Sequence, residues 1–444
     1  MRWNTLDEWL AWQEGLHPQR IDLRLERLQA VWQALGPPPL HGPVMTVGGT
    51  NGKGSTVTYL DACCRAAGLK TGVYTSPHLL RYNERVRIDG QEASDQALCQ
   101  AFARIDLARG EISLTYFEFG TLAALELFSR ARVELILLEV GLGGRLDAVN
   151  LLDADIALVT SIGRDHMAWL GEDPNQIAFE KAGIFRSGRP AIIGSREPPP
   201  RLRGQAEAVN ARVYQLGREF DWQLADSGKS DPPTWHWRHA DGTEFLHLPL
   251  PALTGRVQLD NASAALCALH LLAREQQTAW KMQDAHLRSG LNAARLPGRF
   301  QRIPGAPSWI LDVAHNQDAA RVLADNLREL EVAGQVHLVF GVVEDKEAET
   351  IAALLAPVVD FWYLAEPPGK RAMPLETLAA KVVAATGSDP MLCDDLMNAL
   401  QQAMACASGL DLIVVTGSFM TVEAALRYRA PAAASAAIAS KASV

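Results

Sequence analysis

Short apolar runs alternate with amphipathic stretches through the first two thirds of the chain. The pattern from Ser55 to Ala67 predicts a helix that ends at Gly68. The apolar runs around it are typical of strands buried on both faces, and strands that alternate with helices predict βαβ units and a parallel sheet. The expected strands are Val44–Val47, Gly72–Thr75, Leu135–Leu138 and Ile156–Thr160.

A second alternating series begins near residue 300. Leu296–Phe300 separates it from the first series, so we expect a domain boundary near residues 296–301. The pattern predicts an α/β protein with a first domain of residues 1–296, a second of residues 297–430 and an Ala/Ser-rich tail of residues 431–444. The strands expected in the second domain are Trp309–Leu311, Val336–Phe340, Phe361–Leu364 and Leu412–Val415.

The stretch between these series is less regular. Trp235–His239 and Phe245–Leu248 flank Asp241-Gly242, which predicts a β-hairpin. The tryptophans and histidines are also compatible with a metal or nucleic-acid site. Because no acidic residue or cysteine stands at ligand spacing, we favour a half-buried pair of strands.

Composition narrows the class of protein. Of 444 residues, 48% are hydrophobic and 21% charged, which is typical of a globular protein. The net charge of −9 argues against a general nucleic-acid-binding surface. No apolar run is long enough to span a membrane, and acidic residues interrupt any N-terminal signal sequence. The six cysteines form no Cys-x-x-Cys pair, and reduced thiols in a cytoplasmic protein are expected.

A glycine-rich loop, Gly48–Ser55, stands between an expected strand and an expected helix. Glycines let backbone N–H groups turn inward, and the helix N-terminus favours anions, so the loop predicts a phosphate cradle. Lys53 can reach the β and γ phosphates. The loop departs from the strict Gly-x-x-x-x-Gly-Lys-Ser/Thr pattern, because Val47 replaces its first glycine and Gly54 follows the lysine.

Polar residues follow three of the expected strands. Ser76, Glu139 and His166 each come at or soon after a strand's carboxyl end, where open parallel sheets bind ligands. We expect them to converge beside the phosphate loop and to hold a divalent cation against ATP. Histidine is atypical for magnesium, which prefers oxygen ligands.

Several motifs, in their order along the chain, resemble the folylpolyglutamate synthase family of the Mur ligase superfamily. The resemblance runs from about Asp22 to Phe419 and implies a Mur-ligase-like P-loop domain followed by a smaller Rossmann-like α/β domain. The motifs are Thr50–Ser55, Thr75–Leu79, Leu138–Ala148, Asp165-His166, Glu180–Phe185, Leu296–Phe300 and Asp312–Asn316.

The resemblance implies ATP-dependent ligation of L-glutamate to dihydropteroate and to reduced folates such as tetrahydrofolate, as in the bifunctional members of the family. A substrate carboxylate would attack the γ-phosphate of ATP, and the glutamate amine would attack the resulting acyl phosphate. Such phosphoryl transfer needs clamping cations more than a protein nucleophile. A monomer with two Mg²⁺ sites and no nucleic-acid or membrane partner is expected.

The resemblance also assigns residues to ATP, metal and catalysis. Arg299, from the linker, and Asp312, from the second domain, would contact the nucleotide and couple domain closure to ATP binding. The remaining ATP contacts would be Thr50, Asn51, Gly52, Lys53, Gly54, Ser55 and Asn261, the metal ligands Ser76, Glu139 and His166, and the catalytic residues Lys53, Glu139, His166, Lys181 and His315. Lys181 resembles the family's carbamylated lysine, in which added CO₂ turns a cation into an anionic oxygen ligand.

Three segments resemble the family's pterin contacts. A carboxylate in them can pair with pterin N–H groups, and an aromatic ring can stack on the pterin. Arg24 stands where a small residue is expected, and Asp22 could instead cap the following helix. The implied residues are Asp22, Leu23, Arg24, Leu25, Thr115, Tyr116, Phe117, Glu118, Leu146, Asp147 and Ala148.

Three alternative functions can be weighed against the sequence. A Mur-type ligase of nucleotide-linked cell-wall precursors would need a further N-terminal domain, yet only 47 residues precede Gly48. A guanine-nucleotide switch would carry an Asn-Lys-x-Asp motif, and the chain has no Asn-Lys pair. A folylpolyglutamate synthase without activity on dihydropteroate is the nearest alternative.

Overall fold

The computed structural model describes residues 2–37, 39–225, 232–275 and 283–429. The chain forms two compact units, one of residues 1–252 and 257–295 and the other of residues 253–256 and 296–444. The main segment of the second unit begins at Leu296. The short segment 253–256 also belongs to this unit, and a Cβ on Gly255 would lie 2.7 Å from Asn326 Nδ2. The expected tail, residues 431–444, lies outside the described residues.

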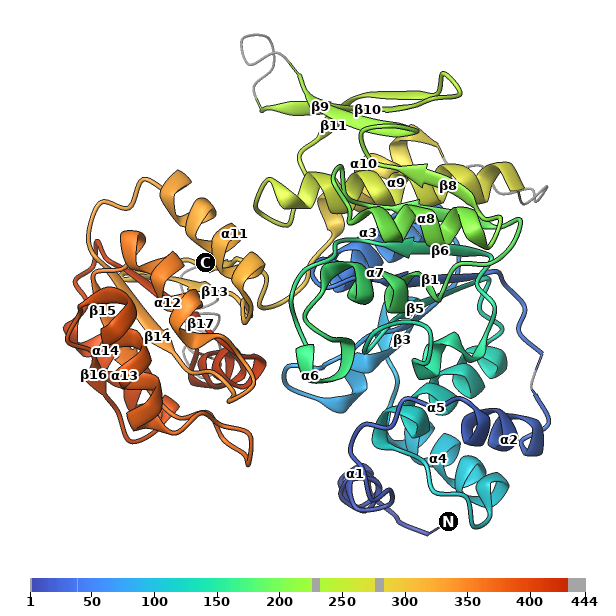
Figure 1. The fold of residues 1–444 in the computed structure, drawn as a ribbon, viewed down its shortest axis with the longest axis horizontal. Helices are drawn as coiled ribbons and strands as arrows, with labels where there is room; N and C mark the ends of the chain where they lie inside the picture. The colour runs from blue at the N-terminus through green and yellow to red at the C-terminus, as the bar shows by residue number, and fades with distance from the viewer. Residues whose placement is uncertain (1, 38, 226–231, 276–282, 430–444) are drawn as a thin grey trace, which may run out of the picture. The chain divides into compact units, whose positions relative to one another are not determined.

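An eight-stranded sheet forms the centre of the first unit (Figure 1). Its order is β4-β3-β2-β5-β1-β6-β7-β8, and all pairs from β2 to β8 are parallel, whereas β3 and β4 add antiparallel pairs at one edge. The strands are β1 (Val44–Gly48), β2 (Thr71–Tyr74), β3 (Val86–Ile88), β4 (Gln91–Glu92), β5 (Leu135–Glu139), β6 (Ile156–Val159), β7 (Pro190–Ile193) and β8 (Arg212–Gln215). The four strands expected here are confirmed to within one residue at each end.

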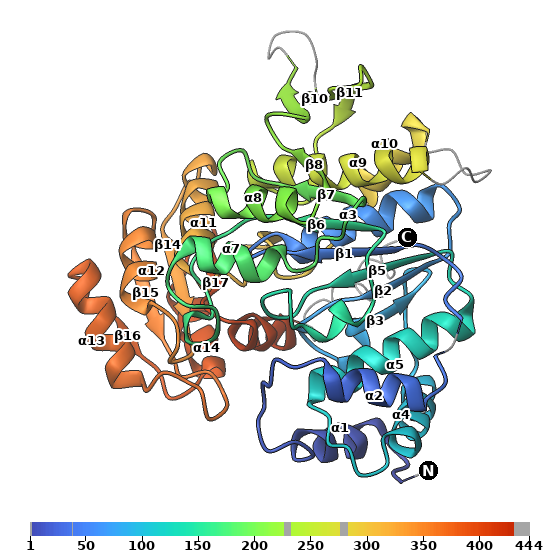
Figure 2. The ribbon, with the colours of Figure 1, turned by 45° about the vertical axis from the view of Figure 1, so that its right-hand side comes forward.

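Helices cover both faces of this sheet (Figure 2). α3, α9 and α10 pack together on one face, and α4 and α5 pack together on the other. Connections between parallel strands need such crossovers, which explains why the sheet is buried on both sides. The helices are α1 (Leu6–Glu14), α2 (Glu26–Ala34), α3 (Lys53–Ala66), α4 (Asp95–Arg109), α5 (Tyr116–Ala131), α6 (Met167–Leu170), α7 (Pro174–Ala182), α8 (Pro200–Ala208), α9 (Val257–Glu275) and α10 (Asp284–Ala293), with 3₁₀ turns at Tyr82–Arg85 and Ala148–Leu151.

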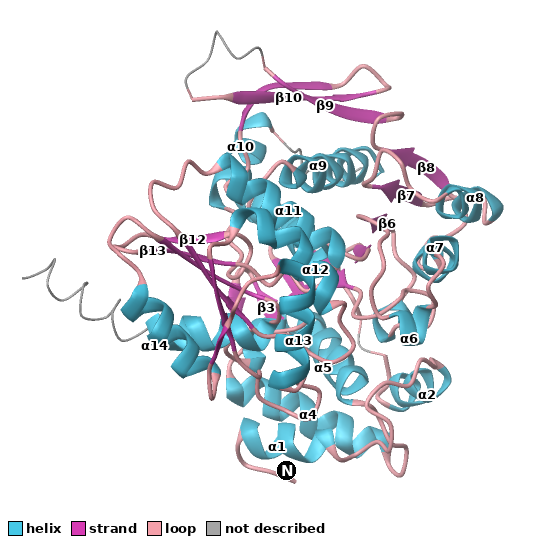
Figure 3. Cartoon of the chain, turned by 60° about the vertical axis from the view of Figure 1, so that its left-hand side comes forward, coloured by secondary structure: helices cyan, strands magenta, loops and turns pink. Residues whose placement is uncertain are grey.

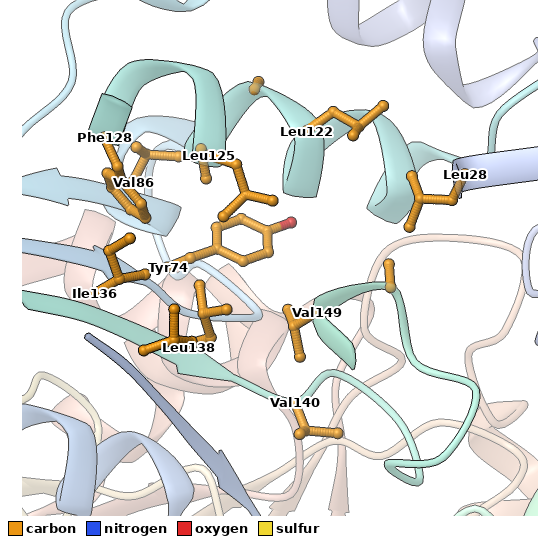
Figure 4. Close-up of a cluster of buried hydrophobic side chains, with 14 of the residues drawn as sticks. Leu28, Tyr74, Val86, Leu122, Leu125, Phe128, Ile136, Leu138, Val140 and Val149 are labelled. Carbon is orange, nitrogen blue, oxygen red and sulfur yellow. The ribbon is translucent and has the colours of Figure 1, made fainter. Parts of the chain in front are cut away.

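Tyr74 of β2 lies at the centre of the apolar layer between the sheet and α5 (Figure 4). Alternate residues of β5, Ile136 and Leu138, face this layer, as the two-residue period of a strand requires. Leu125 and Phe128 of α5 cover them from above. This packing fixes the positions of the carboxyl ends of β2 and β5, where Ser76 and Glu139 lie.

The expected hairpin is confirmed as β10 (Thr234–His239) and β11 (Glu244–Pro249), and β9 (Phe220–Leu224) extends it to three strands. Trp237 is buried, and its indole N–H donates to the Ser263 carbonyl of α9 at 3.1 Å. The expectation that His239 has no acidic partner is wrong. Asp241 in the turn and His270 on α9 both lie beside it, because the turn folds onto that helix.

The second unit contains a six-stranded sheet in the order β12-β13-β17-β14-β15-β16. Two of its strands, β12 and β13, are labelled in Figure 3. The four expected strands are present as β13, β14, β15 and β17, and β12 pairs antiparallel with β13, so the sheet is mixed rather than wholly parallel. The elements are β12 (Gln301–Ile303), β13 (Ser308–Leu311), β14 (Val336–Phe340), β15 (Phe361–Leu364), β16 (Met391–Leu392), β17 (Leu412–Thr416), α11 (Gln317–Glu329), α12 (Ala348–Leu355), α13 (Leu375–Thr386), α14 (Leu396–Cys406) and a 3₁₀ turn at Ala356–Val358.

Two further expectations concern thiols and membranes. All six cysteines are free, and only Cys406 is exposed; burial raises the pKa of the Cys63 thiol to about 12. Within the described ranges, no helix combines the length and the apolar character needed to cross a membrane.

Two glycine substitutions test the packing of α5 on β2. A Cβ on Gly72 would lie 2.7–3.1 Å from ring carbons of Phe128, whereas one on Gly204, inside α8, would meet nothing within 4 Å. We expect Gly72→Ala to destabilise the protein by about 1–3 kcal/mol through overpacking. Gly204→Ala should stabilise it by up to ~1 kcal/mol, since alanine favours a helix interior.

Urea unfolding followed by circular dichroism measures both variants. Equal midpoints for Gly72→Ala and the unsubstituted protein would contradict the close packing of Phe128 on β2.

Candidate active site

The phosphate loop, residues 48–55, connects β1 to α3 and is braced by the segment after β6. The Thr160 hydroxyl donates to the Asn51 carbonyl at 2.6 Å, and the Asn51 N–H donates to Ser161 Oγ at 3.1 Å. The Thr50 hydroxyl donates to the Gly163 carbonyl at 3.1 Å. The loop is therefore held in shape before any ligand binds, and it leads directly into the N-terminus of α3, where N–H groups favour anions.

Two glycines let other elements approach this loop closely. A Cβ on Gly49, where φ is +140°, would lie 1.9 Å from Thr160 Oγ1. A Cβ on Gly52, where φ is +87°, would lie 2.4 Å from Asn261 Oδ1. Asn261 of α9 is buried, and its amide donates to Gln258 at 3.1 Å. The structure thus brings Asn261 to the loop, as the ATP-site prediction requires.

Two lysines share one carbonyl of the loop. Lys53 Nζ donates to the carbonyls of Gly49 and Thr50, both at 3.0 Å, and Lys181 Nζ donates to the same Gly49 carbonyl at 2.9 Å. Lys181 lies in the last turn of α7 and is only 5% exposed. Burial first, and the charge of Lys53 second, lower the pKa of Lys181 to about 7. An amine with this pKa is partly uncharged near neutral pH.

Ser76 and Glu139 meet at the carboxyl ends of β2 and β5. The Ser76 N–H donates to Glu139 Oε2 at 3.1 Å, and Glu139 is 5% exposed. β5 lies between β2 and β1, so this pair stands beside the phosphate loop at one sheet edge. A buried carboxylate beside a serine supplies the oxygen ligands that Mg²⁺ prefers.

His166 follows β6 and precedes α6. Its backbone is left-handed, with φ of 53°, and its N–H donates to Asp165 Oδ1 at 2.8 Å. β6 pairs with β1, which puts His166 on the same edge of the sheet as Glu139. The topology therefore brings the three predicted ligands to the same end of the sheet, where the Ser76 N–H contacts Glu139 directly.

Arg27 connects two of the predicted pterin segments. Its Nε donates to Glu118 at 3.0 Å, and its Nη atoms donate to the Asp22 carboxylate and, at 2.9 Å, to the Asp22 carbonyl. Glu118 also accepts from the Thr115 hydroxyl and N–H, both at 2.8 Å, in a capping box at the start of α5. Residues 22–27 and 115–118 are thus held together although they lie far apart in the sequence.

The suggested capping role of Asp22 is wrong. α2 begins at Glu26, its N-terminal flanking residue is Leu25, and no side chain caps it. The Asp22 carboxylate instead pairs with Arg27 and, at 3.4 Å, with Arg24. The Arg24 side chain is 73% exposed, so it contacts Asp22 from the solvent side.

The third pterin segment joins the second through Phe117. A Cβ on Gly141 would lie 2.7 Å from Phe117 Cζ, so this ring rests directly on the loop that leads to Leu146, Asp147 and Ala148. Asp147 is buried and accepts N–H groups of Leu142 and Val149 at 2.8 and 3.0 Å. Burial raises the pKa of Asp147 to about 6, so its carboxylate is mostly ionised at neutral pH.

The predicted residues of the second unit gather at the carboxyl end of β13. Asp312 accepts from the Phe300 N–H at 2.7 Å and from the Ala314 N–H at 2.8 Å, and burial raises its pKa. The Arg299 guanidinium lies 5.2 Å from the centre of the Phe419 ring, and the His315 ring lies 6.0 Å from the same ring. Arg299, Asp312 and His315 therefore share one region of this unit.

Sequence reasoning did not assign roles to Thr160, Ser161 or Arg27. Thr160 was visible as the end of an expected strand, but its hydroxyl contact with the phosphate loop depends on β6 pairing with β1. Arg27 belongs to the pterin motif, yet its contact with Glu118 spans 91 positions in the chain. Both contacts join residues that lie far apart in the sequence, so no local sequence pattern indicates them.

Comparison with known proteins agrees with this geometry. The Mur ligase middle domain matches residues 47–269, and the Mur ligase glutamate ligase domain matches residues 298–419. The dihydrofolate synthase/folylpolyglutamate synthase of Escherichia coli is 44% identical over 422 residues, covering 94% of both chains. The corresponding protein of Haemophilus influenzae is 38% identical over 446 residues, covering 94% of this chain and 96% of that one.

Solved structures give the same result. E. coli FolC in complex with DHPP and ADP has a TM-score of 0.88 at 42% identity and covers 96% of this chain and 97% of that one. The bifunctional folylpolyglutamate synthase/dihydrofolate synthase of Yersinia pestis, complexed with AMPPNP and Mn ion, has a TM-score of 0.86 at 42% identity and covers 96% and 98%. With this similarity over nearly its whole length, the chain belongs to the dihydrofolate synthase/folylpolyglutamate synthase family of ATP-dependent Mur ligases.

Proposed function

We propose that this protein uses ATP to ligate L-glutamate both to dihydropteroate and to reduced folates such as tetrahydrofolate. The observation that carries the proposal is the phosphate loop, with Lys53 and Lys181 on its Gly49 carbonyl and the Ser76–Glu139 pair at the neighbouring strand ends. Mg²⁺, at two sites, is the proposed metal, and a monomer is the proposed working form. The structures of the relatives named above hold ADP, or AMPPNP with Mn.

In the proposed reaction, a carboxylate of the acceptor attacks the γ-phosphorus of ATP, which gives an acyl phosphate and ADP. The amine of L-glutamate then attacks the acyl carbon, and phosphate leaves. The transferring phosphoryl group carries spread negative charge, so fixed donors lower the barrier more than a nucleophile would. The N–H groups at the start of α3 and the ammonium of Lys53 would supply those donors.

The metal would be held by Ser76 and Glu139, with His166 from the next strand. It would neutralise phosphate charge when bound. In support, the Glu139 carboxylate is buried at the strand end and has the Ser76 N–H on one oxygen, so its position is fixed. From the second unit, we propose that Arg299 and Asp312 contact the nucleotide and that His315 takes part in catalysis.

The acceptor's pterin ring would bind where residues 22–25, 115–118 and 146–148 come together. Asp22 and Asp147 are the carboxylates available for pterin N–H groups, and Tyr116 and Phe117 are the aromatic rings available for stacking. Arg27 supports this proposal as a positioning residue, because its guanidinium holds Asp22 and Glu118 in one arrangement.

Lys53→Ala should reduce ligation at least about a hundredfold while the protein stays folded, since the variant loses transition-state charge stabilisation and little packing. Lys70→Ala is the matched control. Lys70 also donates to a backbone carbonyl, that of Ala131 at 2.7 Å, but outside the loop. ADP release measured with saturating L-glutamate and tetrahydrofolate compares the two, and near-normal turnover by a folded Lys53→Ala protein would refute the role of the loop.

We expect Lys181 to react with CO₂, because its amine is buried, is partly uncharged near pH 7 and lies on the phosphate loop. Protein incubated with ¹³C-bicarbonate should show one carbamate ¹³C resonance that is missing from Lys181→Ala. That variant should lose activity, and added short-chain carboxylate should restore part of it. A spectrum that is the same for both proteins would contradict carbamylation.

The pterin assignment predicts unequal effects on the two acceptors. Asp22→Ala should raise the KM for dihydropteroate by about tenfold or more, because hydrogen-bonding groups of the ligand are left unpaired. The effect on tetrahydrofolate should be smaller, and the KM for ATP should not change. Arg24→Ala should raise the KM for dihydropteroate less than Asp22→Ala does, since that side chain is mostly exposed and contacts Asp22 at 3.4 Å.

Assays of ADP release with L-glutamate and each of dihydropteroate, tetrahydrofolate and a UDP-muramoyl acceptor test the proposed function itself. Turnover of tetrahydrofolate alone would reduce it to folylpolyglutamate synthesis, and turnover of the UDP-muramoyl acceptor alone would overturn it.

A further inference from the structure

A group of metal-ligating side chains lies away from the phosphate loop, where the β10–β11 turn meets α9. His239 ends β10, Asp241 lies in the turn, and His270 projects from α9; we call these three residues the turn–helix cluster. One potential ligand atom from each residue lies within 4.8 Å of the other two. From this geometry we propose that the turn–helix cluster binds one transition-metal ion of the zinc type.

The distances within the cluster suit a single ion. His239 Nδ1 lies 3.0 Å from Asp241 Oδ1, and His270 Nε2 lies 2.9 Å from Asp241 Oδ2. Ligand atoms placed about 2.0–2.2 Å from a tetrahedral Zn²⁺ are separated by roughly 3.3 Å. Both pairs are near this separation, and the longest separation among the three ligand atoms, at most 4.8 Å, would shorten when the ion binds. Two imidazoles and one carboxylate leave a fourth position for water, as in many zinc sites.

The ligand set also selects the class of metal. Imidazole nitrogen suits Zn²⁺, Co²⁺ and Ni²⁺, whereas Mg²⁺ prefers oxygen. The cluster is therefore chemically distinct from the oxygen-rich pair of Ser76 and Glu139 at the sheet edge.

The surroundings of His239 give an independent reason. Its side chain is 4% exposed, and its Nε2 has no hydrogen-bond partner within the part of the chain that the structure describes. Its Nδ1 faces both the Asp241 N–H at 3.2 Å and the Asp241 carboxylate at 3.0 Å. His239 Nδ1 thus already lies against a carboxylate oxygen, so one cation could be bound by both atoms.

The scaffold holds the imidazoles in place. The His239 ring lies between Tyr214 and Trp237, with ring centres 5.6 and 6.0 Å away, and the His270 ring lies 4.7 Å from that of His239. Asp241 Oδ1 accepts from the Thr243 N–H at 3.0 Å. Ligands fixed in this way lose little conformational freedom on binding an ion.

Arg274 is the competitor for this site. It lies one turn after His270 on α9, and its guanidinium contacts Asp241 Oδ2. Its side chain is 56% exposed, so it can move into solvent when an ion takes its place on the carboxylate. The proposal therefore makes a prediction that a purely structural ion pair would not: removing Arg274 should strengthen metal binding.

The test titrates Zn²⁺ into full-length protein freed of metal by a chelator, without ATP or Mg²⁺, by isothermal calorimetry. We expect one equivalent to bind with a Kd of about 10 μM or tighter. His270→Gln and Asp241→Asn should each weaken binding more than about tenfold, since even loss of an outer partner of a metal ligand costs that much. Arg274→Ala should tighten it severalfold.

His236→Gln is the matched control. His236 also lies on β10 and also faces a second histidine, His247, with ring centres 4.7 Å apart, but the turn carboxylate contacts His239 and His270 instead. Its Zn²⁺ affinity should equal that of the unsubstituted protein. Circular dichroism checks the fold of each variant, and Co²⁺ in place of Zn²⁺ should give the visible absorption of a tetrahedral site that His270→Gln lacks.

Three results would overturn the proposal: no saturable binding below about 100 μM, an unchanged affinity in folded His270→Gln and Asp241→Asn, or a loss of affinity in His236→Gln. None of these readouts depends on ligase activity, so a failure here leaves the proposed function standing.

Discussion

The structure depends on how closely other elements approach the backbone of the phosphate loop. At positions 49 and 52 a Cβ would fall 1.9 and 2.4 Å from side-chain oxygens of Thr160 and Asn261. Glycine is the residue that leaves this space and tolerates the positive φ at both positions. With it, β6 and α9 can brace the loop from two sides, and the sheet order then puts the ends of β2 and β5 beside it.

Much of the fold followed from local pattern. The runs Leu135–Leu138 and Val336–Phe340 are fully apolar because their strands are covered on both faces, so their type and position could be read directly. Strands at the edges were harder to find. Gln91–Glu92 and Gln301–Ile303 are short and polar in part, the first exposed and the second half-buried, and they pair only because a neighbouring strand offers an edge.

The candidate site was predictable where it is made of motifs and strand ends. Ser76 and Glu139 could be grouped because parallel strands deliver their carboxyl ends to one edge, and the Ser76–Glu139 contact follows from that rule. The partners of Arg27 and of His239 were not predictable, since Glu118 and His270 come from helices whose packing no local sequence records. The same limit explains why Asp22 was considered a helix cap when its carboxylate belongs to an ion pair.

The Gly49 carbonyl has a consequence for the energy landscape of the loop. It accepts from Lys53 and from Lys181 at once, so two amines are drawn to one dipole. Burial first, and the charge of Lys53 second, lower the pKa of Lys181. In landscape terms the loop is locally frustrated: its contacts are individually favourable but cannot all be optimal together. An anion arriving at the loop, or a negative charge acquired by Lys181, removes the conflict. The loop arrangement that is unfavourable in the unliganded protein is thus the one that a bound anion stabilises.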